Sequence, residues 1–501
     1  MTLTLLPRPR HLFLQNNSFP LPAQGLIVIE AARPADVRTT AVRLQRALAE
    51  RRSIRWEIQA GGVAALPNTA VTLRLRPELK SRPESYTLTI TAAGVELSAP
   101  DEAGLFHGVS TLLQIDAQSP AGWPCLHIDD WPDFAARGVM LDISRDKVPT
   151  LESTFALVDR LAGWKINQFQ LYTEHTFAYR QHEEVWAKAS PFTGDDILAL
   201  DAYCRERYIE LVPNQNSFGH LHRWFDHERY RPLAEVTGGF DTPWGIRMEG
   251  SFSLCPGDPG SLELLRGLYD ELLPHFTSRQ FNVGCDETVD LGQGRSRADV
   301  EARGVGRVYL DFLHKIHAEV KGRGRVMQFW GDIIIQHPEL IAELPRDVIA
   351  LEWGYEADHD FATRCPQYKA SGIPFYVCPG TSAWNSIAGR TTNALGNLRN
   401  AAAAGVEHGA IGYLNTDWGD NGHWQAEPAH DLGFAAGAAY SWAWEANRDL
   451  DLVDALNRHA YADDANVLGR VAHDLGDVYR VPGETPHNNS ILFNALQRTL
   501  E

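Results

Sequence analysis

The sequence predicts an α/β fold in which a small α/β domain precedes a catalytic (β/α)8 TIM barrel. The 501 residues exceed what one small core needs. Between about residues 135 and 450, short apolar runs alternate with amphipathic helical runs, as in a closed parallel barrel. The apolar runs are nearly continuous, which is typical of strands that are covered on both faces.

Eight apolar runs are predicted to be the barrel strands, each followed by a helix. In chain order they are RGVMLDIS (137–144), INQFQLYTE (166–174), IELVPNQNS (209–217), QFNVGCDE (280–287), RVMQFWGD (325–332), VIALEWG (348–354), PFYVCP (374–379) and AIGYLNTDWGD (410–420). Helical stretches such as 150–164 and 304–320 lie between them. Most runs end in an acid, an amide or an indole, and a barrel carries its active site at the carboxyl ends of its strands.

The chain is predicted to have three parts. Residues 1–133 form an N-terminal non-catalytic α/β domain, residues 134–448 the catalytic barrel, and residues 449–501 a C-terminal helical extension packed on the barrel. In the first part, AVTLRLRP and SYTLTITAAGVELSAP alternate as half-buried strands, and a helix is expected to begin near Asp101.

The amino-acid composition indicates which kinds of binding partner and which cellular location to expect. The formal net charge of −18 opposes binding to a phosphate backbone, so no nucleic acid partner is expected. The six cysteines include no C-x-x-C pair, and neither a signal peptide nor a membrane span is visible. We therefore expect a cytoplasmic enzyme without membrane association, and a homodimer is compatible with the sequence. The 14 Trp residues fit either core filling or stacking on sugar rings.

Two adjacent carboxylates, Asp286 and Glu287, end the fourth predicted strand. Neighbouring strand residues point to opposite faces, so the pair can share a pocket only where the backbone turns. An isolated Asp-Glu pair is most often a solvated loop, but here an apolar run and Gly284 precede it, which favours catalysis.

Clustered carboxylates commonly bind metal ions or act at a glycosidic bond. A metal site would need further ligands, for which the candidates are His220, Glu174, Asp332 and Asp417. The chain has no H-x-H and no H-E-x-x-H motif. We therefore expect neither a metal nor a cofactor, and favour glycoside chemistry.

Four motifs resemble glycoside hydrolase family 20, the β-N-acetylhexosaminidases. FNVGCDET (281–288) is similar to the family's His/Asn-Ile-Gly-Gly-Asp-Glu signature, and ARGVMLDISR (136–145) to its first barrel strand. GLFHGVSTLLQI (104–115) is similar to the helix of its N-terminal domain, and VPNQNSFGH (212–220) to its Val-Pro-Glu-Ile-Asp-x-Pro-Gly-His stretch. The motifs occur in order over nearly the whole chain. GCDETVDLGQG, SFGHL and YTEHTFAY resemble the intracellular hexosaminidase D branch more than the secreted lysosomal type.

The resemblance implies roles for the acid pair in a substrate-assisted mechanism. The acetamido carbonyl of an N-acetylhexosamine would attack the anomeric carbon. Asp286 would orient the acetamide and stabilise the cyclic oxazolinium ion. Glu287, with a pKa raised by its enclosed site, would protonate the leaving oxygen and later deprotonate water.

The resemblance also implies residues that bind the sugar. Arg137 matches an arginine that binds O3 and O4, with an ion pair to Asp142 or Asp146 as the alternative. The aromatic matches have barrel core packing as their alternative. Trp330 and Trp353 match the two walls of the acetamido pocket, and Trp418 matches the ring beneath the sugar. Tyr376 is the candidate for the tyrosine that binds the acetamido oxygen, with Trp384 nearby.

Three departures from the family pattern affect the remaining roles. YTEHTFAY replaces the usual His-Leu-Thr-Asp-Asp, so Glu174 is the acid expected to support His220. A buried, hydrogen-bonded histidine is the alternative for His220. Asn216 replaces an aspartate of the family. TDWGD replaces a Trp-x-Glu whose acid binds O4 and O6, which leaves Asp417 or Asp420 for that role.

The function expected is that of a retaining exo-β-N-acetylhexosaminidase that releases terminal β-linked N-acetylglucosamine or N-acetylgalactosamine from carbohydrate substrates. Three other functions stay open. They are a metal-dependent barrel hydrolase or lyase, a sugar-binding barrel that has lost catalysis, and a related hydrolase that acts on a modified amino sugar such as a sulfated one.

Overall fold

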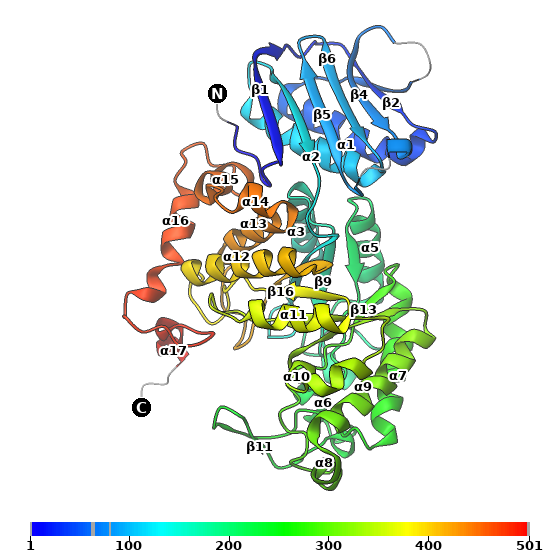
Figure 1. The fold of residues 1–501 in the computed structure, drawn as a ribbon, viewed down its shortest axis with the longest axis vertical. Coiled ribbons are helices and arrows are strands. Elements are labelled where there is room, and N and C mark those ends of the chain that lie inside the picture. Colours follow the sequence, from blue (N-terminus) through cyan, green and yellow to red (C-terminus); the bar gives the residue numbers. More distant parts are fainter. Residues whose placement is uncertain (1–2, 62–65, 80–81, 498–501) are drawn as a thin grey trace.

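The computed structural model describes residues 3–61, 66–79 and 82–497. Two sheets organise this part of the chain: a seven-stranded mixed sheet near the N-terminus and an eight-stranded parallel sheet that forms a barrel (Figure 1). The predicted fold class is confirmed.

The N-terminal sheet has the strand order β1-β7-β5-β6-β4-β2-β3. Its strands, in chain order, are β1 (His11–Phe19), β2 (Leu26–Glu30), β3 (Glu57–Ala60), β4 (Thr69–Leu75), β5 (Tyr86–Thr91), β6 (Gly94–Ala99) and β7 (Trp123–Asp130). Helix α2 (Glu102–Gln118) begins as predicted, because the Asp101 side chain accepts a hydrogen bond from Gly104 N at 2.8 Å. The strands predicted before it are present as β4, β5 and β6.

A second helix of this part, α1 (Pro34–Arg52), was not predicted. Its buried residues Val37, Ala41, Leu44 and Leu48 recur at intervals of three or four, which is the helical period. Arginines fill much of the other face, so the mean hydropathy of the segment is low and hides this pattern.

All eight predicted barrel strands are present, in the predicted order. They are β8 (Ala136–Asp142), β9 (Gln168–Tyr172), β10 (Glu210–Val212), β13 (Gln280–Asn282), β14 (Val326–Trp330), β15 (Val348–Trp353), β16 (Phe375–Cys378) and β17 (Gly412–Asp417). Strand β17 pairs in parallel with β8. Beyond the ends of β10 and β13, Asn282 N donates to Pro213 O at 2.9 Å and Gln215 N donates to Asn282 O at 3.0 Å. These bonds join β10 to β13, the strands at the two ends of the sheet, and so close the barrel.

Helices follow seven of the barrel strands as expected: α3 (Leu151–Gly163), α5 (Gly194–Arg205), α7 (Pro259–Leu272), α9 (Val305–Gly322), α11 (Phe361–Ser371), α12 (Thr391–His408) and α13 (Pro428–Trp442). After β14 the chain forms only α10 (Asp332–Ile335) and a 3₁₀ turn (Pro338–Glu343). Pro338 and Pro345 lie in this stretch, and proline disfavours a helix interior because it lacks an amide N–H.

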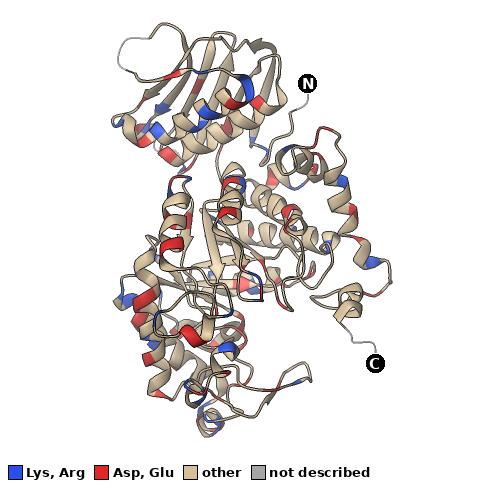
Figure 2. Ribbon diagram, turned by 180° about the vertical axis from the view of Figure 1, so that it is seen from behind, with Lys and Arg blue, Asp and Glu red and all other residues tan. Residues whose placement is uncertain are grey.

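The loops that connect these elements contain shorter helices and a hairpin. They are α4 (Glu183–Trp186), α6 (His222–Phe225), α8 (Arg297–Arg303), α14 (Trp444–Asn447) and the hairpin of β11 (Phe240–Asp241) and β12 (Arg247–Met248). The C-terminal part contains the helices α15 (Leu452–His459), α16 (Leu468–Leu475) and α17 (Ile491–Gln497), which lie along one side of the barrel (Figure 1). Acidic and basic residues are interspersed on the outer helices (Figure 2).

The barrel interior is more polar than the sequence analysis expected. Gln170 Nε2 donates to Gln328 Oε1 at 2.9 Å, and Asn282 Nδ2 donates to Gln170 Oε1 at 3.0 Å. Tyr376 Oη donates to Gln280 Oε1 at 3.1 Å. The strands were predicted to be continuously apolar, but their inward positions carry amides that satisfy one another.

Arg137 lies between the two sheets, at the amino end of β8. Its guanidinium is fully buried, forms an ion pair with Glu84, and donates to Lys165 O at 2.9 Å and Phe134 O at 3.0 Å. Asp130 at the end of β7 accepts from Lys165 Nζ at 3.0 Å. Buried charges from both parts of the chain therefore pair with each other at this junction.

We expect Arg137→Met to lower the unfolding midpoint by about 5 °C or more, because removal of one partner leaves Glu84 uncompensated. Scanning calorimetry measures the shift. Arg205→Met is the control. Arg205 is exposed, and its Nε atom lies 3.6 Å from Asp201 Oδ2 one helical turn away, so this surface ion pair should contribute little stability. An Arg137→Met midpoint equal to that of the control would contradict the importance of the buried pair.

Candidate active site

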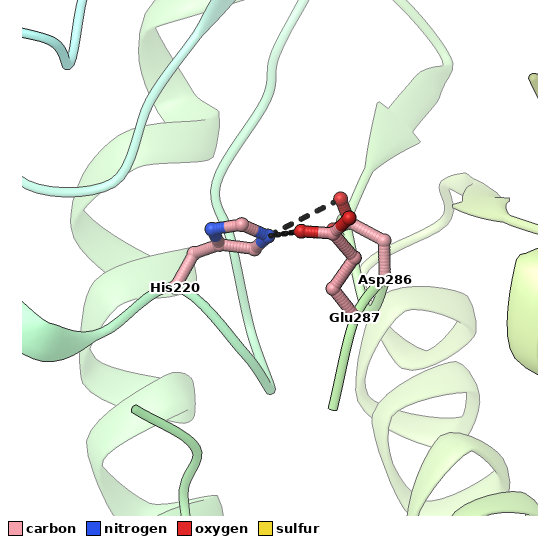
Figure 3. Close-up of side chains that lie close together, drawn as sticks. All are labelled: His220, Asp286 and Glu287. Atoms are coloured by element: carbon pink, nitrogen blue, oxygen red, sulfur yellow. Dashed lines mark ion pairs between the residues drawn. The ribbon is translucent and has the colours of Figure 1, made fainter. Parts of the chain in front are cut away.

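Asp286 and Glu287 lie just beyond the carboxyl end of β13, where the backbone leaves the extended conformation. Gly284, Cys285 and Glu287 have positive φ angles of 68°, 70° and 47°. These left-handed residues rotate the chain, so both carboxylates reach the same imidazole (Figure 3). The turn required for a shared pocket is therefore present.

Asn216, which follows β10, shapes this turn. A Cβ atom at Gly284 would lie 2.0 Å from Asn216 Oδ1, so only glycine fits there. Cys285 N donates to Asn216 Oδ1 at 3.4 Å, and Tyr309 Oη donates to Cys285 O at 2.8 Å. Asn216 Nδ2 donates to Tyr172 Oη at 2.5 Å. The asparagine that departs from the family motif thus supports the acid pair.

His220 contacts three acids. Its Nε2 atom lies 3.4 Å from Asp286 Oδ2 and 3.5 Å from Glu287 Oε2, and its Nδ1 atom lies 3.7 Å from Glu174 Oε1. Burial by itself would lower the pKa of His220, but the Asp286 charge and hydrogen bonds to both acids raise that pKa to about 10. A pKa of about 10 favours the protonated imidazole at neutral pH, whereas Arg145 Nη2, 3.4 Å from Nδ1, opposes it. Glu174 lies beside the same ring nitrogen.

The same three groups have the spacing of a small metal site. One ligand atom from each of His220, Asp286 and Glu287 lies within 4.8 Å of the others. A divalent ion there would have to displace the imidazolium proton, because only neutral imidazole binds a metal. The same three residues could therefore act either as a protonated histidine paired with two acids or as ligands of a metal ion.

Arg145, three residues beyond Asp142 at the end of β8, is the arginine of this site. Its guanidinium lies 2.9 Å from Asp142 Oδ2 and 3.0 Å from Glu174 Oε1. It also lies over the rings of Tyr172 and Trp418, 4.8 Å and 5.5 Å from their centroids. Acids on two neighbouring strands and two aromatic faces therefore hold it in place.

The expectation that Arg137 binds the sugar is corrected. Arg137 is at the amino end of β8 and is buried against Glu84 and backbone carbonyl oxygens. The amino ends of barrel strands lie at the opposite face from the site. RGVMLDISR carries an arginine at each end, and sequence reasoning chose the wrong one. The position of Arg145 beyond the strand's carboxyl end was the available signal.

Aromatic side chains at the ends of β14, β15 and β17 form a cluster beside the acids. The rings of Trp330 and Trp418 are 6.0 Å apart, and Trp418 meets Tyr172 edge-on at 4.6 Å. Trp353 is partly exposed at the end of β15. Trp384, in the loop after β16, is buried and donates from Nε1 to Asn488 Oδ1 at 2.9 Å.

Tyr355 is a site tyrosine that sequence reasoning missed. Its ring stacks on Trp353 at 5.1 Å, meets Trp384 edge-on at 5.1 Å and lies 6.3 Å from Trp418. Burial raises the pKa of Tyr355 well above its usual range, and the nearby Asp286 charge adds to the effect. The signal was its place two residues beyond Trp353, past the end of a strand.

Tyr376, expected to face the acetamido oxygen, is corrected. It is the second residue of β16, and its hydroxyl lies among the amides of the barrel interior, 3.4 Å from Gln168 Nε2 and 3.1 Å from Gln280 Oε1. Residues early in a barrel strand lie deep below the rim, so Tyr376 belongs to the interior network.

Of the two acids in TDWGD, Asp420 is the one at the site. Asp417 is fully buried and forms an ion pair with His430 at 3.2 Å, on helix α13 outside the barrel. Burial raises the pKa of Asp420 to about 6, Arg145 opposes the rise, and the Glu287 charge adds to it. Asp417 is therefore corrected to a structural acid, and the open alternative, Asp420, is retained.

Several buried polar atoms at the site have no hydrogen-bond partner among the described residues, and they include Asp286 Oδ1, Trp330 Nε1, Trp353 Nε1 and Trp418 Nε1. Buried polar atoms are almost always satisfied, so such atoms indicate a place for ligand groups. Nearby, Glu287 N donates to Asp332 Oδ2 at 3.2 Å, and burial beside the Asp286 and Glu287 charges raises the pKa of Asp332 well above its usual range.

The parallel barrel thus carries an acid pair, an arginine and indoles at its carboxyl rim, which are groups suited to acid/base chemistry and to contact with a sugar ring. Residues 2–131 match the family model described as glycosyl hydrolase family 20, domain 2, and residues 134–384 match the model of the family 20 catalytic domain. The chain belongs to glycosyl hydrolase family 20.

Individual relatives are distant. A beta-hexosaminidase of Akkermansia muciniphila is 26% identical over 309 residues, which cover 54% of this chain and 61% of the relative. A beta-hexosaminidase of Vibrio furnissii is 25% identical over 434 residues, 77% of this chain and 64% of the relative. The chain thus spans less than two thirds of the length of these curated relatives. The chitobiase structure from Flavobacterium johnsoniae has a TM-score of 0.73 at 19% identity, covering 94% of this chain and 73% of that one.

The raised pKa of His220 makes stability depend on pH. The pKa is about 10 in the folded state against about 6.5 in the unfolded chain, so the imidazolium's contribution is complete below pH ~6.5 and is lost as pH rises through ~10. We expect the unfolding midpoint of wild type to exceed that of His220→Asn at pH 7, and this difference to shrink by several degrees towards pH 10. A difference independent of pH, measured by calorimetry, would contradict the charged imidazole.

Proposed function

We propose that the protein is a retaining exo-β-N-acetylhexosaminidase that removes terminal N-acetylglucosamine or N-acetylgalactosamine by substrate-assisted catalysis. The observation that carries this proposal is the state of Asp286. Its Oδ2 atom faces His220, while its buried Oδ1 atom has no partner among the described residues. An acetamido N–H would satisfy Oδ1, and the indole walls suit an apolar acetamide methyl group and a sugar face.

The chemistry proceeds in two steps. The acetamido oxygen attacks the anomeric carbon as Glu287 transfers its proton to the departing oxygen, which gives a bicyclic oxazolinium ion. Asp286 accepts the N–H hydrogen bond and its negative charge stabilises the cation. Glu287 then removes a proton from water as that water attacks the anomeric carbon, so the configuration is retained.

The remaining side chains position the sugar. Arg145 has N–H groups beyond those used on Asp142 and Glu174, and its fork suits two vicinal hydroxyls such as O3 and O4. Asp420 is placed to accept hydrogen bonds from O4 or O6. Tyr355, beside Asp286, is placed to donate to the acetamido oxygen.

A cytoplasmic location remains a prediction. All six cysteines are free and buried, which fits a reducing compartment. In the part of the chain that the structure describes, no helix has the length and apolarity needed to cross a bilayer. The homodimer and the hexosaminidase D-like branch likewise remain predictions.

We expect Glu287→Gln to slow hydrolysis of an alkyl N-acetyl-β-glucosaminide by about 10²–10⁴-fold, because that leaving group needs a proton donor. The rate of the first step with a dinitrophenyl glycoside should fall far less, since its leaving group is stable as an anion. Steady-state and burst kinetics measure both.

Asp286→Asn is the matched comparison. It should slow both substrates, since the oxazolinium ion forms in each case. Equal losses for the two substrates in Glu287→Gln would reject its role as the acid. Equally fast cleavage of a glycoside lacking the 2-acetamido group would reject the substrate-assisted mechanism.

A metal-dependent hydrolase is the second candidate, because His220, Asp286 and Glu287 have metal-site spacing. We expect activity on a nitrophenyl N-acetylglucosaminide to be unchanged after dialysis against EDTA, since the protonated imidazole already neutralises part of the acid charge. Elemental analysis before and after dialysis provides the control. Loss of activity that returns with a stoichiometric divalent ion would favour the metal-dependent function.

A further inference from the structure

The segment before α17 returns to the loop that follows β16. Asn488 Oδ1 accepts from Trp384 Nε1 at 2.9 Å, and Asn488 O accepts from Asn385 Nδ2 at 3.1 Å. Asn488 N donates to Glu356 Oε1 at 2.7 Å. The side-chain Oδ1 of one C-terminal residue, together with its backbone O and N, therefore binds loops at the barrel rim, roughly a hundred residues earlier in the chain. Figure 1 shows this C-terminal part running down the side of the barrel towards α17.

Asn385 connects this segment to the site. Its Nδ2 atom also donates to Asp420 Oδ2 at 3.0 Å, and its Oδ1 atom accepts from Asn421 Nδ2 at 3.0 Å. Ser490 Oγ donates to Asn385 O at 3.1 Å. Asn385 is buried and has a positive φ of 49°, a conformation that needs support from its surroundings. The C-terminal segment supplies that support through Asn488 and Ser490.

Trp384 gives a second connection to the site. Its ring packs edge-on against Tyr355 at 5.1 Å, and a Cβ atom at Gly380 would lie 2.4 Å from the same indole. The indole therefore has little room on the barrel side. Its N–H is held from the outside by Asn488. Asn488 thus contacts both Asn385, the hydrogen-bond partner of Asp420, through its backbone O, and Trp384 through its side chain.

We propose that Asn488 is a positioning residue that holds Asp420 and Trp384, and thereby determines how strongly the C4 and C6 hydroxyls of the non-reducing sugar are recognised. This inference rests on the proposed function, in which Asp420 binds those hydroxyls. The C-terminal extension then contributes to substrate specificity, in addition to covering the barrel.

A purely structural role would have different consequences. Glu356, the third partner of Asn488, is also paired with Arg390 at 2.9 Å, so the loop has an anchor besides the C-terminal segment. If Asn488 only fastens the segment, its loss lowers stability and leaves the relative rates of different substrates unchanged. Substrates that differ by one hydroxyl therefore separate the two roles.

The test compares Asn488→Ala with Asn489→Ala in the full chain. Among the described contacts, Asn489 Oδ1 accepts only from Ser490 N, at 2.7 Å, and does not reach the β16 loop. Nitrophenyl N-acetyl-β-glucosaminide and its 4-deoxy and 6-deoxy analogues are assayed. For wild type and Asn489→Ala, we expect removal of at least one hydroxyl to lower kcat/KM about tenfold or more.

Asn385→Ala removes the bond to Asp420 and the bond to the backbone O of Asn488. For it we expect a KM raised about five-fold or more, kcat changed by less than about three-fold, and a loss of kcat/KM on removal of the hydroxyl that falls to about two-fold. Asn488→Ala keeps its backbone bonds and loses only the bond to Trp384, so we expect the same changes in KM and in the hydroxyl-dependent loss, but smaller than those of Asn385→Ala. The proposal would be overturned if both Asn385→Ala and Asn488→Ala had lowered unfolding midpoints but lost as much kcat/KM as wild type when the hydroxyl is removed. Should Asn488→Ala not fold, the outcome for Asn385→Ala decides. A wild-type protein inactive on every N-acetylhexosaminide would instead refute the proposed function.

Discussion

The left-handed turn after β13 is the constraint on which the site depends. Adjacent residues of a strand diverge, so two neighbouring carboxylates normally serve different surroundings. Here Gly284, Cys285 and Glu287 take positive φ angles, and both acids meet His220. The turn persists because Asn216 leaves no room for a side chain at position 284 and because Tyr309 holds the Cys285 carbonyl oxygen.

Electrostatics then sets the character of the site. Six acids gather around one arginine and one histidine, and the acids are Asp142, Glu174, Asp286, Glu287, Asp332 and Asp420. Burial and repulsion between the acids raise the pKa values of Asp332 and Asp420. Burial alone would lower the pKa of His220, but attraction to the Asp286 charge raises it to about 10. An environment with this excess of negative charge favours a cation at its centre. The oxazolinium ion of the proposed reaction is such a cation, and it forms where Asp286 can stabilise it.

The rigid frame around this charge is itself polar. Amides such as Gln170, Gln280 and Gln328 fill the barrel below the rim and satisfy one another, so the strands are fixed by directional bonds as well as by packing. At the amino end, Arg137 and Glu84 join the barrel to the N-terminal sheet. At the rim, Asn488 brings the C-terminal segment against the β16 loop. Each part of the chain thus contributes a buried polar contact to the barrel.

The fold class, the order of all eight barrel strands and the acid pair could be predicted from the amino-acid sequence. These features are local: an apolar run fixes a strand, and Asp286 and Glu287 are adjacent in the chain. Which arginine, tyrosine and aspartate lie near the acid pair became visible only in the tertiary structure. Arg145, Tyr355 and Asp420 lie beyond strand ends, whereas Arg137, Tyr376 and Asp417 lie within strands. Where a strand ends, and to which side each residue then turns, depends on contacts between distant segments. The role of Asn488 has the same origin, because no periodicity links a C-terminal asparagine to a loop so far away in the chain.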